Sequence, residues 1–169
     1  MCELPDSVYS SSLFTKDCLK EKKYYFVKAV CDGDTISLTS CDRSQKEKKI
    51  RLLGIDAFES KQGFYGKEAK DFLTNLVLNK NVCIETDIEE KDKYERTLGY
   101  VFINESLVFI NEELLKTGHA ILYSFPPNIK YTNKLKKAQI FARESMHGIW
   151  EKQDYIIETP AQWRQKHKN

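Results

Sequence analysis

The sequence predicts an α+β protein, built on a five-stranded antiparallel β-barrel with three α-helices. Apolar and polar residues alternate in two runs at 24–30 and 35–39, and further stretches typical of strands follow at 49–55, 81–87 and 98–103. Between and after these stretches, apolar residues repeat at helical spacing. The chain has 169 residues, a length that favours one domain with a single core.

The first three strands come from the segment 24–55. Residues 24–30 and 35–39 alternate in polarity. The tripeptide Asp32-Gly33-Asp34 between them is typical of a hairpin turn, where glycine is free to take a positive φ. A polar, lysine-rich loop then leads to a third strand at 49–55.

Helices and two more strands complete the pattern. The first helix carries one apolar stripe, formed by Ala69, Phe72, Leu73, Leu76 and Val77. Strands follow at 81–87 and 98–103, and then a short helix that Asn111 opens and Gly118 ends. A last helix ends at Gly148, and its apolar positions are Leu135, Ala138, Ala142 and Met146.

Three strands, a helix, two strands and two helices are the order of the OB barrel, which characteristically binds oligonucleotides on one face. Fold alone does not assign an activity, so a site must be found. We expect the domain to occupy residues 23–150, after a flexible N-terminal arm at 1–22. Residues 151–169 are a polar tail that packs on the domain or trails from it, with Trp163 as a tether.

Charge and hydrophobicity limit how the protein can bind nucleic acid or a membrane. The 27 Lys and Arg residues nearly balance 25 Asp and Glu residues, for a net charge of +2. Any affinity for nucleic acid must therefore come from a local basic patch. No apolar run approaches the ~18 residues that a membrane helix needs.

The cysteines and the N-terminus leave alternatives open. Five cysteines without a C-x-x-C pair exclude a zinc knuckle, and we expect Cys31, Cys41 and Cys83 to be buried free thiols. No signal peptide is visible. Cys2 is either an ordinary residue or the lipid-bearing N-terminus left after signal removal. We expect a secreted or cell-envelope protein.

Four acidic residues lie at the predicted ends of strands: Asp32, Asp34, Asp56 and Glu59. Because the first three strands are neighbours in a barrel, these carboxylates can converge on one rim. Clustered oxygen ligands without His or Cys favour Ca²⁺, Mg²⁺ or Mn²⁺ over zinc. Taken singly, each acid also fits a solvated turn residue.

Two arginines accompany the acids. Arg51 lies within an apolar strand and needs a partner or a ligand, and an internal salt bridge to Asp32 or Asp34 is the alternative. Arg96 follows Lys93 and Tyr94 in a segment that otherwise reads as a polar hairpin loop. A carboxylate-bound metal with two arginines is what a phosphodiester transition state requires, because the charge grows on the phosphoryl oxygens.

These residues resemble the staphylococcal (micrococcal) nuclease family, the thermonuclease-like OB-fold nucleases. The resemblance covers about residues 24–164. Its ordered motifs are Val30-Cys31-Asp32-Gly33-Asp34-Thr35, Arg51-Leu52-Leu53-Gly54-Ile55-Asp56 with Glu59, Tyr65-Gly66-Lys67-Glu68-Ala69, Asp92-Lys93-Tyr94-Glu95-Arg96-Thr97-Leu98-Gly99-Tyr100, Asn111-Glu112 and Gly148-Ile149-Trp150. Pro160 and Trp163-Arg164 are similar to the tail of many members.

The resemblance implies a role for each matching residue. Asp34, Asp56 and the backbone carbonyl of Ala57 would bind Ca²⁺, and Asp32 would orient metal-bound water from outside the ligand set. Glu59 would be the general base. Arg51 and Arg96 would bind the phosphate and stabilise the pentacoordinate state, and three further residues would hold the terminal phosphate or the neighbouring nucleotide: Lys93, Tyr94 and Tyr123. Phe125, where the family has a second tyrosine, would keep a stacking face for substrate binding.

The implied activity is Ca²⁺-dependent endonucleolytic hydrolysis of DNA and RNA, preferentially single-stranded or frayed, leaving 3′-phosphate and 5′-hydroxyl ends. We expect the enzyme to be a monomer. The alternatives are a noncatalytic nuclease-like OB module that binds single-stranded nucleic acid, and a metal-free OB protein that acts through protein contacts.

Four positions depart from the family pattern. Ala57-Phe58 replaces Thr-Pro before the expected base, which removes the φ restraint of proline. Phe58 is expected to hold this loop instead, by packing its ring on the barrel. Glu95 replaces a glycine, so a side chain and a negative charge lie at a position suited to positive φ, and Phe125 replaces a second tyrosine.

Overall fold

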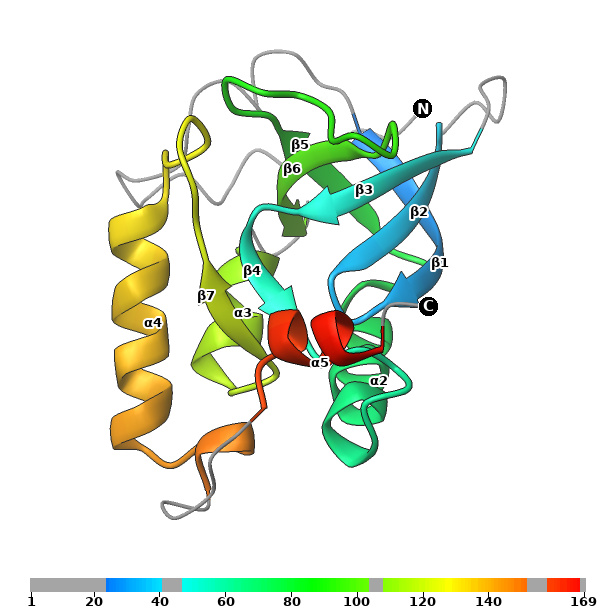
Figure 1. The fold of residues 1–169 in the computed structure, drawn as a ribbon. Coiled ribbons are helices and arrows are strands. Elements are labelled where there is room, and N and C mark those ends of the chain that lie inside the picture. The colour runs from blue at the N-terminus through cyan, green and yellow to red at the C-terminus, as the bar shows by residue number, and fades with distance from the viewer. Residues whose placement is uncertain (1–23, 41–46, 104–107, 152–157, 168–169) are drawn as a thin grey trace, which may run out of the picture.

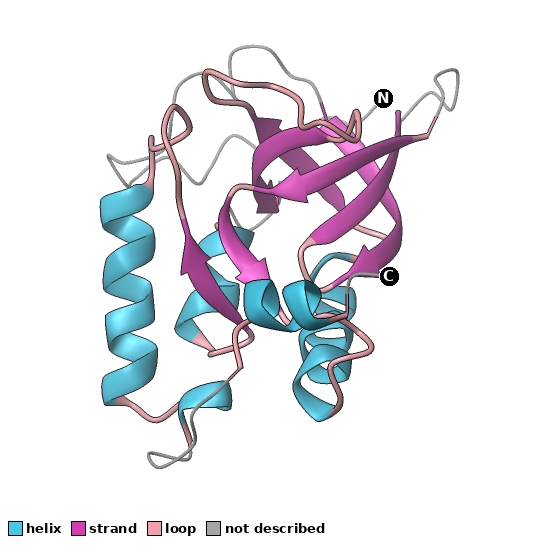
Figure 2. Cartoon of the chain, viewed as in Figure 1, coloured by secondary structure: helices cyan, strands magenta, loops and turns pink. Residues whose placement is uncertain are grey.

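The computed structural model describes residues 24–40, 47–103, 108–151 and 158–167. Five strands close into a barrel in the order β1–β2–β3–β6–β5. They are β1 (Tyr24–Asp32), β2 (Thr35–Ser40), β3 (Lys48–Leu52), β5 (Asn81–Glu85) and β6 (Thr97–Ile103). Figures 1 and 2 show the barrel beside a helical layer. The predicted α+β barrel is therefore confirmed.

The barrel is mixed and not purely antiparallel, which corrects the prediction. Strands β3 and β6 pair in parallel, with Arg51 opposite Leu98, whereas the other four neighbouring pairs are antiparallel. The reason is geometric. Directions can alternate around a closed ring only when the number of strands is even, so a barrel of five strands must contain at least one parallel pair.

The predicted third strand is also corrected, because it is interrupted. β3 ends at Leu52, Gly54 takes a φ of 75°, and β4 (Gly54–Ala57) leaves the barrel. β4 pairs antiparallel with β7 (Ala120–Tyr123), a strand that the sequence pattern did not predict. This branch matters for the site because it carries Asp56 out of the barrel wall, opposite Ile121.

The described residues contain four α-helices where three were expected. They are α2 (Phe64–Val77), α3 (Ile110–Lys116), α4 (Thr132–Glu144) and α5 (Pro160–Lys166), with a short 3₁₀ helix η1 (Gly148–Trp150). α5 lies in the predicted tail, and a capping box between Thr159 and Gln162 starts it. The tail therefore contributes an ordered element near the end of β4 (Figure 1).

Asn111 does not cap its helix as predicted. The cap position of α3 is Phe109, and Asn111 lies fully buried inside the first turn. Its amide accepts a hydrogen bond from the N–H of Val101 at 2.9 Å and donates one to the carbonyl of Leu53 at 2.8 Å. Asn111 thus ties α3 to β6 and to the point where β3 gives way to β4.

The hydrophobic core fills the barrel and continues under the helices. Inward residues of the strands include Val27, Ile36, Leu52 and Tyr100, all at most 1% exposed. α2 adds Ala69, Leu73 and Val77 from its apolar stripe, whereas Phe72 and Leu76 are partly buried. No helix in the described part of the chain is long and apolar enough to cross a membrane.

The cysteine predictions were mostly wrong. Cys31 is a free thiol but is exposed, and Cys83 is buried but disulfide-bonded. Cys41, the predicted arm at 1–22 and the suggested lipid anchor at Cys2 lie outside the described residues.

Candidate active site

Asp34 and Asp56 are brought together where the β1–β2 turn meets β4. The N–H of Ala57 in β4 donates a hydrogen bond to Oδ2 of Asp34 at 3.1 Å, and the hydroxyl of Thr35 donates to Oδ1 at 3.0 Å. Asp56 is fully buried. Both carboxylates therefore have defined positions, set by backbone elements 22 residues apart in the sequence.

The β1–β2 turn can reach β4 because Gly33 has no side chain. A Cβ at this position would lie 2.8 Å from the Cβ of Ala57 and 2.9 Å from that of Ala69. Gly33 does not use the positive φ that the turn sequence allowed, because its φ lies outside the left-handed region. The glycine is therefore needed for close approach and not for its conformational freedom.

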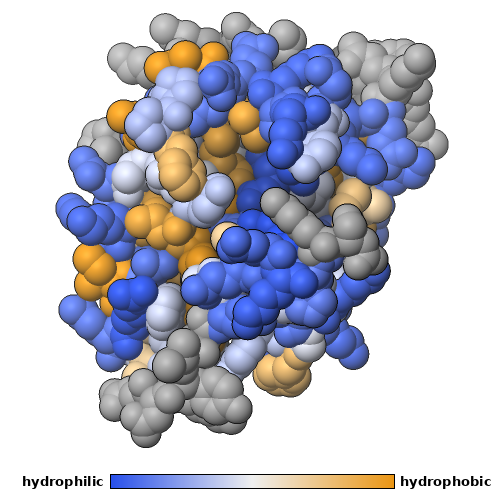
Figure 3. Space-filling model, viewed as in Figure 1, coloured by the Kyte–Doolittle hydropathy of each residue, from blue (hydrophilic) through white to orange (hydrophobic). Residues whose placement is uncertain are grey.

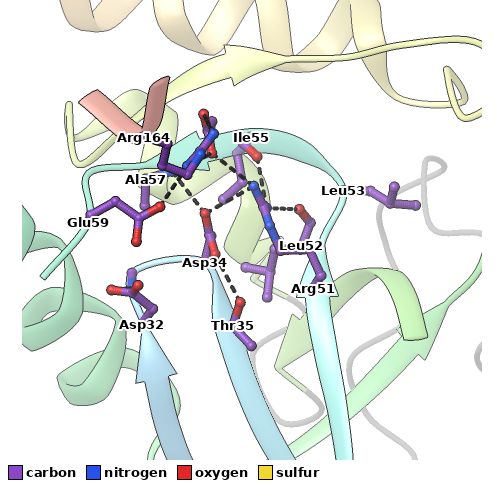
Figure 4. A network of polar contacts seen from close by, with 12 residues as sticks. Asp32, Asp34, Thr35, Arg51, Leu52, Leu53, Ile55, Ala57, Glu59 and Arg164 are labelled. Carbon is purple, nitrogen blue, oxygen red and sulfur yellow. Dashed lines mark hydrogen bonds and ion pairs between the residues drawn. The ribbon is translucent and has the colours of Figure 1, made fainter. Parts of the chain in front are cut away.

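Arg51 bridges the two aspartates from the neighbouring strand β3. Its Nη2 atom lies 3.0 Å from Oδ2 of Asp34 and 3.0 Å from Oδ1 of Asp56. Its Nη1 atom donates to the carbonyls of Leu52 at 2.7 Å and Ile55 at 2.9 Å. The internal salt bridge considered for Arg51 is thus present, with Asp34 and Asp56 as its partners (Figure 4).

A second arginine, Arg164 of α5, also binds Asp56 and links it to Glu59, and it was not among the predicted site residues. Its Nη2 atom lies 2.7 Å from Oδ2 of Asp56, and its Nη1 atom lies 2.7 Å from Oε1 of Glu59 and 3.2 Å from Oδ1 of Asp56. Figure 4 shows its guanidinium beside Glu59 and Ala57. The capping box at Thr159 and the tail motif Trp163-Arg164 were the available signals for an ordered helix, but neither indicated its partners.

Glu59 lies in the loop between β4 and α2, and two neighbours position it. Its N–H donates to the side-chain oxygen of Gln62 at 3.3 Å, and its carbonyl accepts from the N–H of Gln62 at 2.7 Å. A Cβ at Gly66 in α2 would lie 1.8 Å from this carbonyl oxygen. Phe58 is 2% exposed, and its ring lies 5.9 Å from that of Tyr65 in α2. The loop therefore contacts α2 at both Phe58 and Glu59.

Asp32 lies near Glu59 (Figure 4), whose pKa its negative charge helps burial to raise, but within the described residues no ion pair joins Asp32 to either arginine. Its Oδ1 atom accepts hydrogen bonds from the hydroxyl of Ser60 at 2.7 Å and from the N–H of Gly33 at 3.0 Å. Within the described ranges, no three His, Cys, Asp or Glu side chains are grouped closely enough to hold a metal ion. The expectation that four acids converge is thus met only in part.

Arg96 lies across from the acids in the segment before β6. Its Nε atom donates to Oδ2 of Asp92 at 2.7 Å, and Nη1 lies 3.5 Å from the Thr35 hydroxyl. Its guanidinium lies 5.5 Å from the ring centre of Tyr94, and the ammonium of Lys93 lies 5.0 Å from the same ring. The expected cluster of cations around an aromatic ring is therefore present.

Glu95 does not face this cluster with its charge. It has a φ of 60°, as expected where the family has glycine, and its carboxylate lies 2.7 Å from the ammonium of Lys91. Because both side chains are mostly exposed, this ion pair adds little to the free energy of unfolding. It does direct the negative charge of Glu95 to Lys91 and not to the cations of the cluster.

These elements enclose a groove of about 780 Å³. Most of the predicted site residues line it, together with Arg164: Asp32, Asp34, Arg51, Glu59, Lys93, Tyr94, Arg96, Tyr123 and Phe125. The rings of Tyr123 and Phe125 lie 4.5 Å apart and are exposed. In Figure 3, hydrophilic side chains gather over α5 and hydrophobic ones on the side of β7 and α4.

Burial and the arginines act in opposite directions on the acids. Burial raises the pKa of the Asp56 carboxyl, and the hydrogen bond from Arg164 and the charge of Arg51 oppose the rise. Burial also raises the pKa of Glu59, against the hydrogen bond from Arg164. For Asp92, burial is outweighed by hydrogen bonds from Arg96 and from the N–H of Tyr94, which lower its pKa.

The donors fit a hard divalent cation in kind. Asp34, Asp56 and the carbonyl of Ala57 offer oxygen ligands of the type that Ca²⁺ prefers. In this structure, however, guanidinium groups are bound to both oxygens of Asp56. The chemistry of the ligands therefore suits the ion, provided that an arginine gives up its place.

Comparisons with known proteins show which family the chain resembles. Residues 49–152 match the family model described as staphylococcal nuclease homologue. The chain is 38% identical to the thermonuclease of Staphylococcus intermedius over 133 residues, which cover 76% of each chain. It is 35% identical to an uncharacterized endonuclease of Haemophilus influenzae over 151 residues, or 89% of this chain and 78% of that one.

A thermonuclease of Staphylococcus hyicus is 37% identical over 131 residues, which cover 75% of each chain. The names of these relatives describe nucleases, and they support a nuclease function for this chain. Arg164 lies beyond the residues that the family model matches.

Proposed function

The chain belongs to the staphylococcal nuclease family, and from this premise we propose that it is a Ca²⁺-dependent endonuclease that hydrolyses phosphodiester bonds of DNA and RNA. One observation carries the proposal. The same groove is lined by two acids, Asp34 and Glu59, and by the two predicted arginines, Arg51 and Arg96. This combination suits a phosphoryl transfer, in which a water is activated and growing negative charge is neutralised.

The proposed roles follow from position and charge. Glu59 accepts a proton from the attacking water as the new bond to phosphorus forms. Arg96 donates hydrogen bonds to the nonbridging oxygens, whose charge increases. Arg51 binds the phosphate through its Nε–H, because its Nη atoms already donate to two carboxylates and two carbonyls. The bond from phosphorus to O5′ breaks, O5′ takes a proton from solvent, and the products have 3′-phosphate and 5′-hydroxyl ends.

Asp34, Asp56 and the Ala57 carbonyl would hold the Ca²⁺ ion, which supplies positive charge at the phosphate when bound. Asp32 would orient water near the ion, and its link to Ser60 supports a fixed orientation. Lys93 and Tyr94 would bind a neighbouring phosphate or nucleotide.

Single-stranded or frayed nucleic acid is the proposed substrate form. Tyr94, Tyr123 and Phe125 are exposed on the groove and can stack on unpaired bases, which are available only where strands separate. We further propose that the enzyme acts as a monomer and is secreted or associated with the cell envelope. Size-exclusion chromatography and fractionation of the native source test these two points.

Digestion of plasmid and single-stranded DNA and of RNA, with Ca²⁺ and with a chelator, tests the activity. We expect cleavage only with Ca²⁺, and products that phosphatase treatment shows to end in 3′-phosphate. Binding of a labelled oligonucleotide without any cleavage, by protein shown to be folded, would instead support the noncatalytic OB module.

A further inference from the structure

Arg164 holds the carboxylates that the proposed Ca²⁺ site needs. It donates to both oxygens of Asp56 and to one oxygen of Glu59. A calcium–oxygen bond is about 2.4 Å long. An ion on Oδ2 of Asp56 and the Nη2 atom of Arg164, 2.7 Å from that oxygen, would be within about 5 Å of each other. Two cations this close repel, so they compete for the oxygen.

Arg51 contacts Asp56 as well but is less able to leave. Its side chain is 14% exposed, against 38% for Arg164. It lies on barrel strand β3 and also donates to the carbonyls of Leu52 and Ile55. Arg164, by contrast, lies on a seven-residue helix outside the barrel (Figure 1).

Few interactions join α5 and its cap to the rest of the described chain. Besides the contacts of Arg164, the side chain of Gln62 donates to the carbonyl of Glu158 at 2.8 Å, and Pro160 is buried. The ion pair of Lys166 with Glu158 lies within the segment itself. A helix this short is marginal in water without packing. Loss of the Arg164 contacts would therefore release the helix.

We propose that Arg164 and a divalent cation compete for Asp56 and Glu59. α5 is then an intramolecular inhibitor of metal binding, and it detaches from the site when the metal binds. This inference rests on the proposed function, because the competing ion is the Ca²⁺ of the proposed nuclease. It means that the tail controls the affinity of the site for the metal. Because the coupling is reciprocal, the Arg164 contacts weaken metal binding by the same free energy by which the bound metal weakens those contacts.

Equilibrium dialysis of the full chain with radioactive calcium tests the competition. Arg164→Gln removes the cation and keeps a side chain of similar length, whereas Lys166→Ala removes a cation from the same helix that does not contact Asp56 or Glu59. We expect Arg164→Gln to bind Ca²⁺ roughly tenfold more tightly than wild type and Lys166→Ala to bind as wild type does. Thermal unfolding checks that each variant is folded.

Hydrogen exchange of residues 159–167 gives a second readout without any enzyme assay. In wild type, saturating Ca²⁺ should speed exchange at the N–H groups of Trp163 and His167, which are bonded within α5. In Arg164→Gln, exchange there should already be fast without Ca²⁺.

The results that would overturn the competition can be told apart from those that would overturn the proposed function. If Arg164→Gln binds Ca²⁺ as wild type does, or more weakly, the competition is overturned and the Ca²⁺ site stands. If neither protein binds Ca²⁺, both the competition and the Ca²⁺-dependent function are overturned. Unchanged protection of α5 at saturating Ca²⁺ would overturn its release.

Discussion

At the scale of single residues, the two predicted arginines of the groove have different surroundings. Arg51 is fixed by two carboxylates and two carbonyls inside the fold. Arg96 is fixed by Asp92 and lies beside the ring of Tyr94. Removing Arg51 would disturb the structure as well as the site, so Arg96 gives the cleaner test of phosphate binding.

Replacing Arg96 by lysine should lower the rate of cleavage by about 10²-fold, a loss on the order of 3 kcal/mol of transition-state stabilisation. Lysine keeps the charge but cannot donate two parallel hydrogen bonds to a phosphate. Single-turnover rates at saturating Ca²⁺ measure the effect. Lys91→Ala is the matched control, because Lys91 lies in the same loop and pairs with Glu95 outside the groove. Equal rates for Arg96→Lys and wild type would remove Arg96 from the catalytic set.

At the scale of elements, α2 supports the loop that carries Glu59. The helix begins at Phe64, and its Gly66 allows the backbone of Glu59 to lie against it. Phe58 was expected to hold this loop by packing on the barrel. It is buried, but its aromatic partner is Tyr65 of α2.

Gly66→Ala should displace Glu59, because the added Cβ would lie 1.8 Å from the Glu59 carbonyl oxygen and the backbone must move. We expect a loss of about 1–3 kcal/mol in the free energy of unfolding. The rate should also fall at temperatures where the variant remains folded. Denaturant unfolding and single-turnover assays measure the two effects. Lys67→Ala, exposed on the same helix, is the control. Full activity in folded Gly66→Ala would show that this contact does not position Glu59.

At the scale of the whole molecule, local patterns predicted the barrel and failed where long-range contacts decide. The residue pattern located β1, β2, β5 and β6, although most of β2 and β6 is buried on both faces. It did not reveal the break at Leu53 or strand β7, since β4 and β7 are only four residues each and stabilise one another.

The candidate site divides in the same way. Asp34, Asp56 and Arg51 were predicted from strand ends and from a charge within an apolar strand, and they are in contact. Arg164 was not predicted as a partner, because its contacts with Asp56 and Glu59 span 108 and 105 residues. Likewise, the link of Asp32 to Ser60 depends on how the Glu59 loop folds back.

The near balance of charge over the molecule also has a local basis. The acids of the groove lie beside arginines that pair with them, so a net charge of +2 conceals a local concentration of both acidic and basic side chains. We propose that Glu59 acts in this groove as the general base that cleaves nucleic acid.

The most direct test is the single-turnover rate of cleavage of a labelled single-stranded oligonucleotide by wild type and Glu59→Gln at saturating Ca²⁺. We expect cleavage by wild type and a rate lower by about 10²-fold or more in the variant, with oligonucleotide affinity retained. Equal rates in the two proteins, or binding without cleavage by wild type, would contradict it.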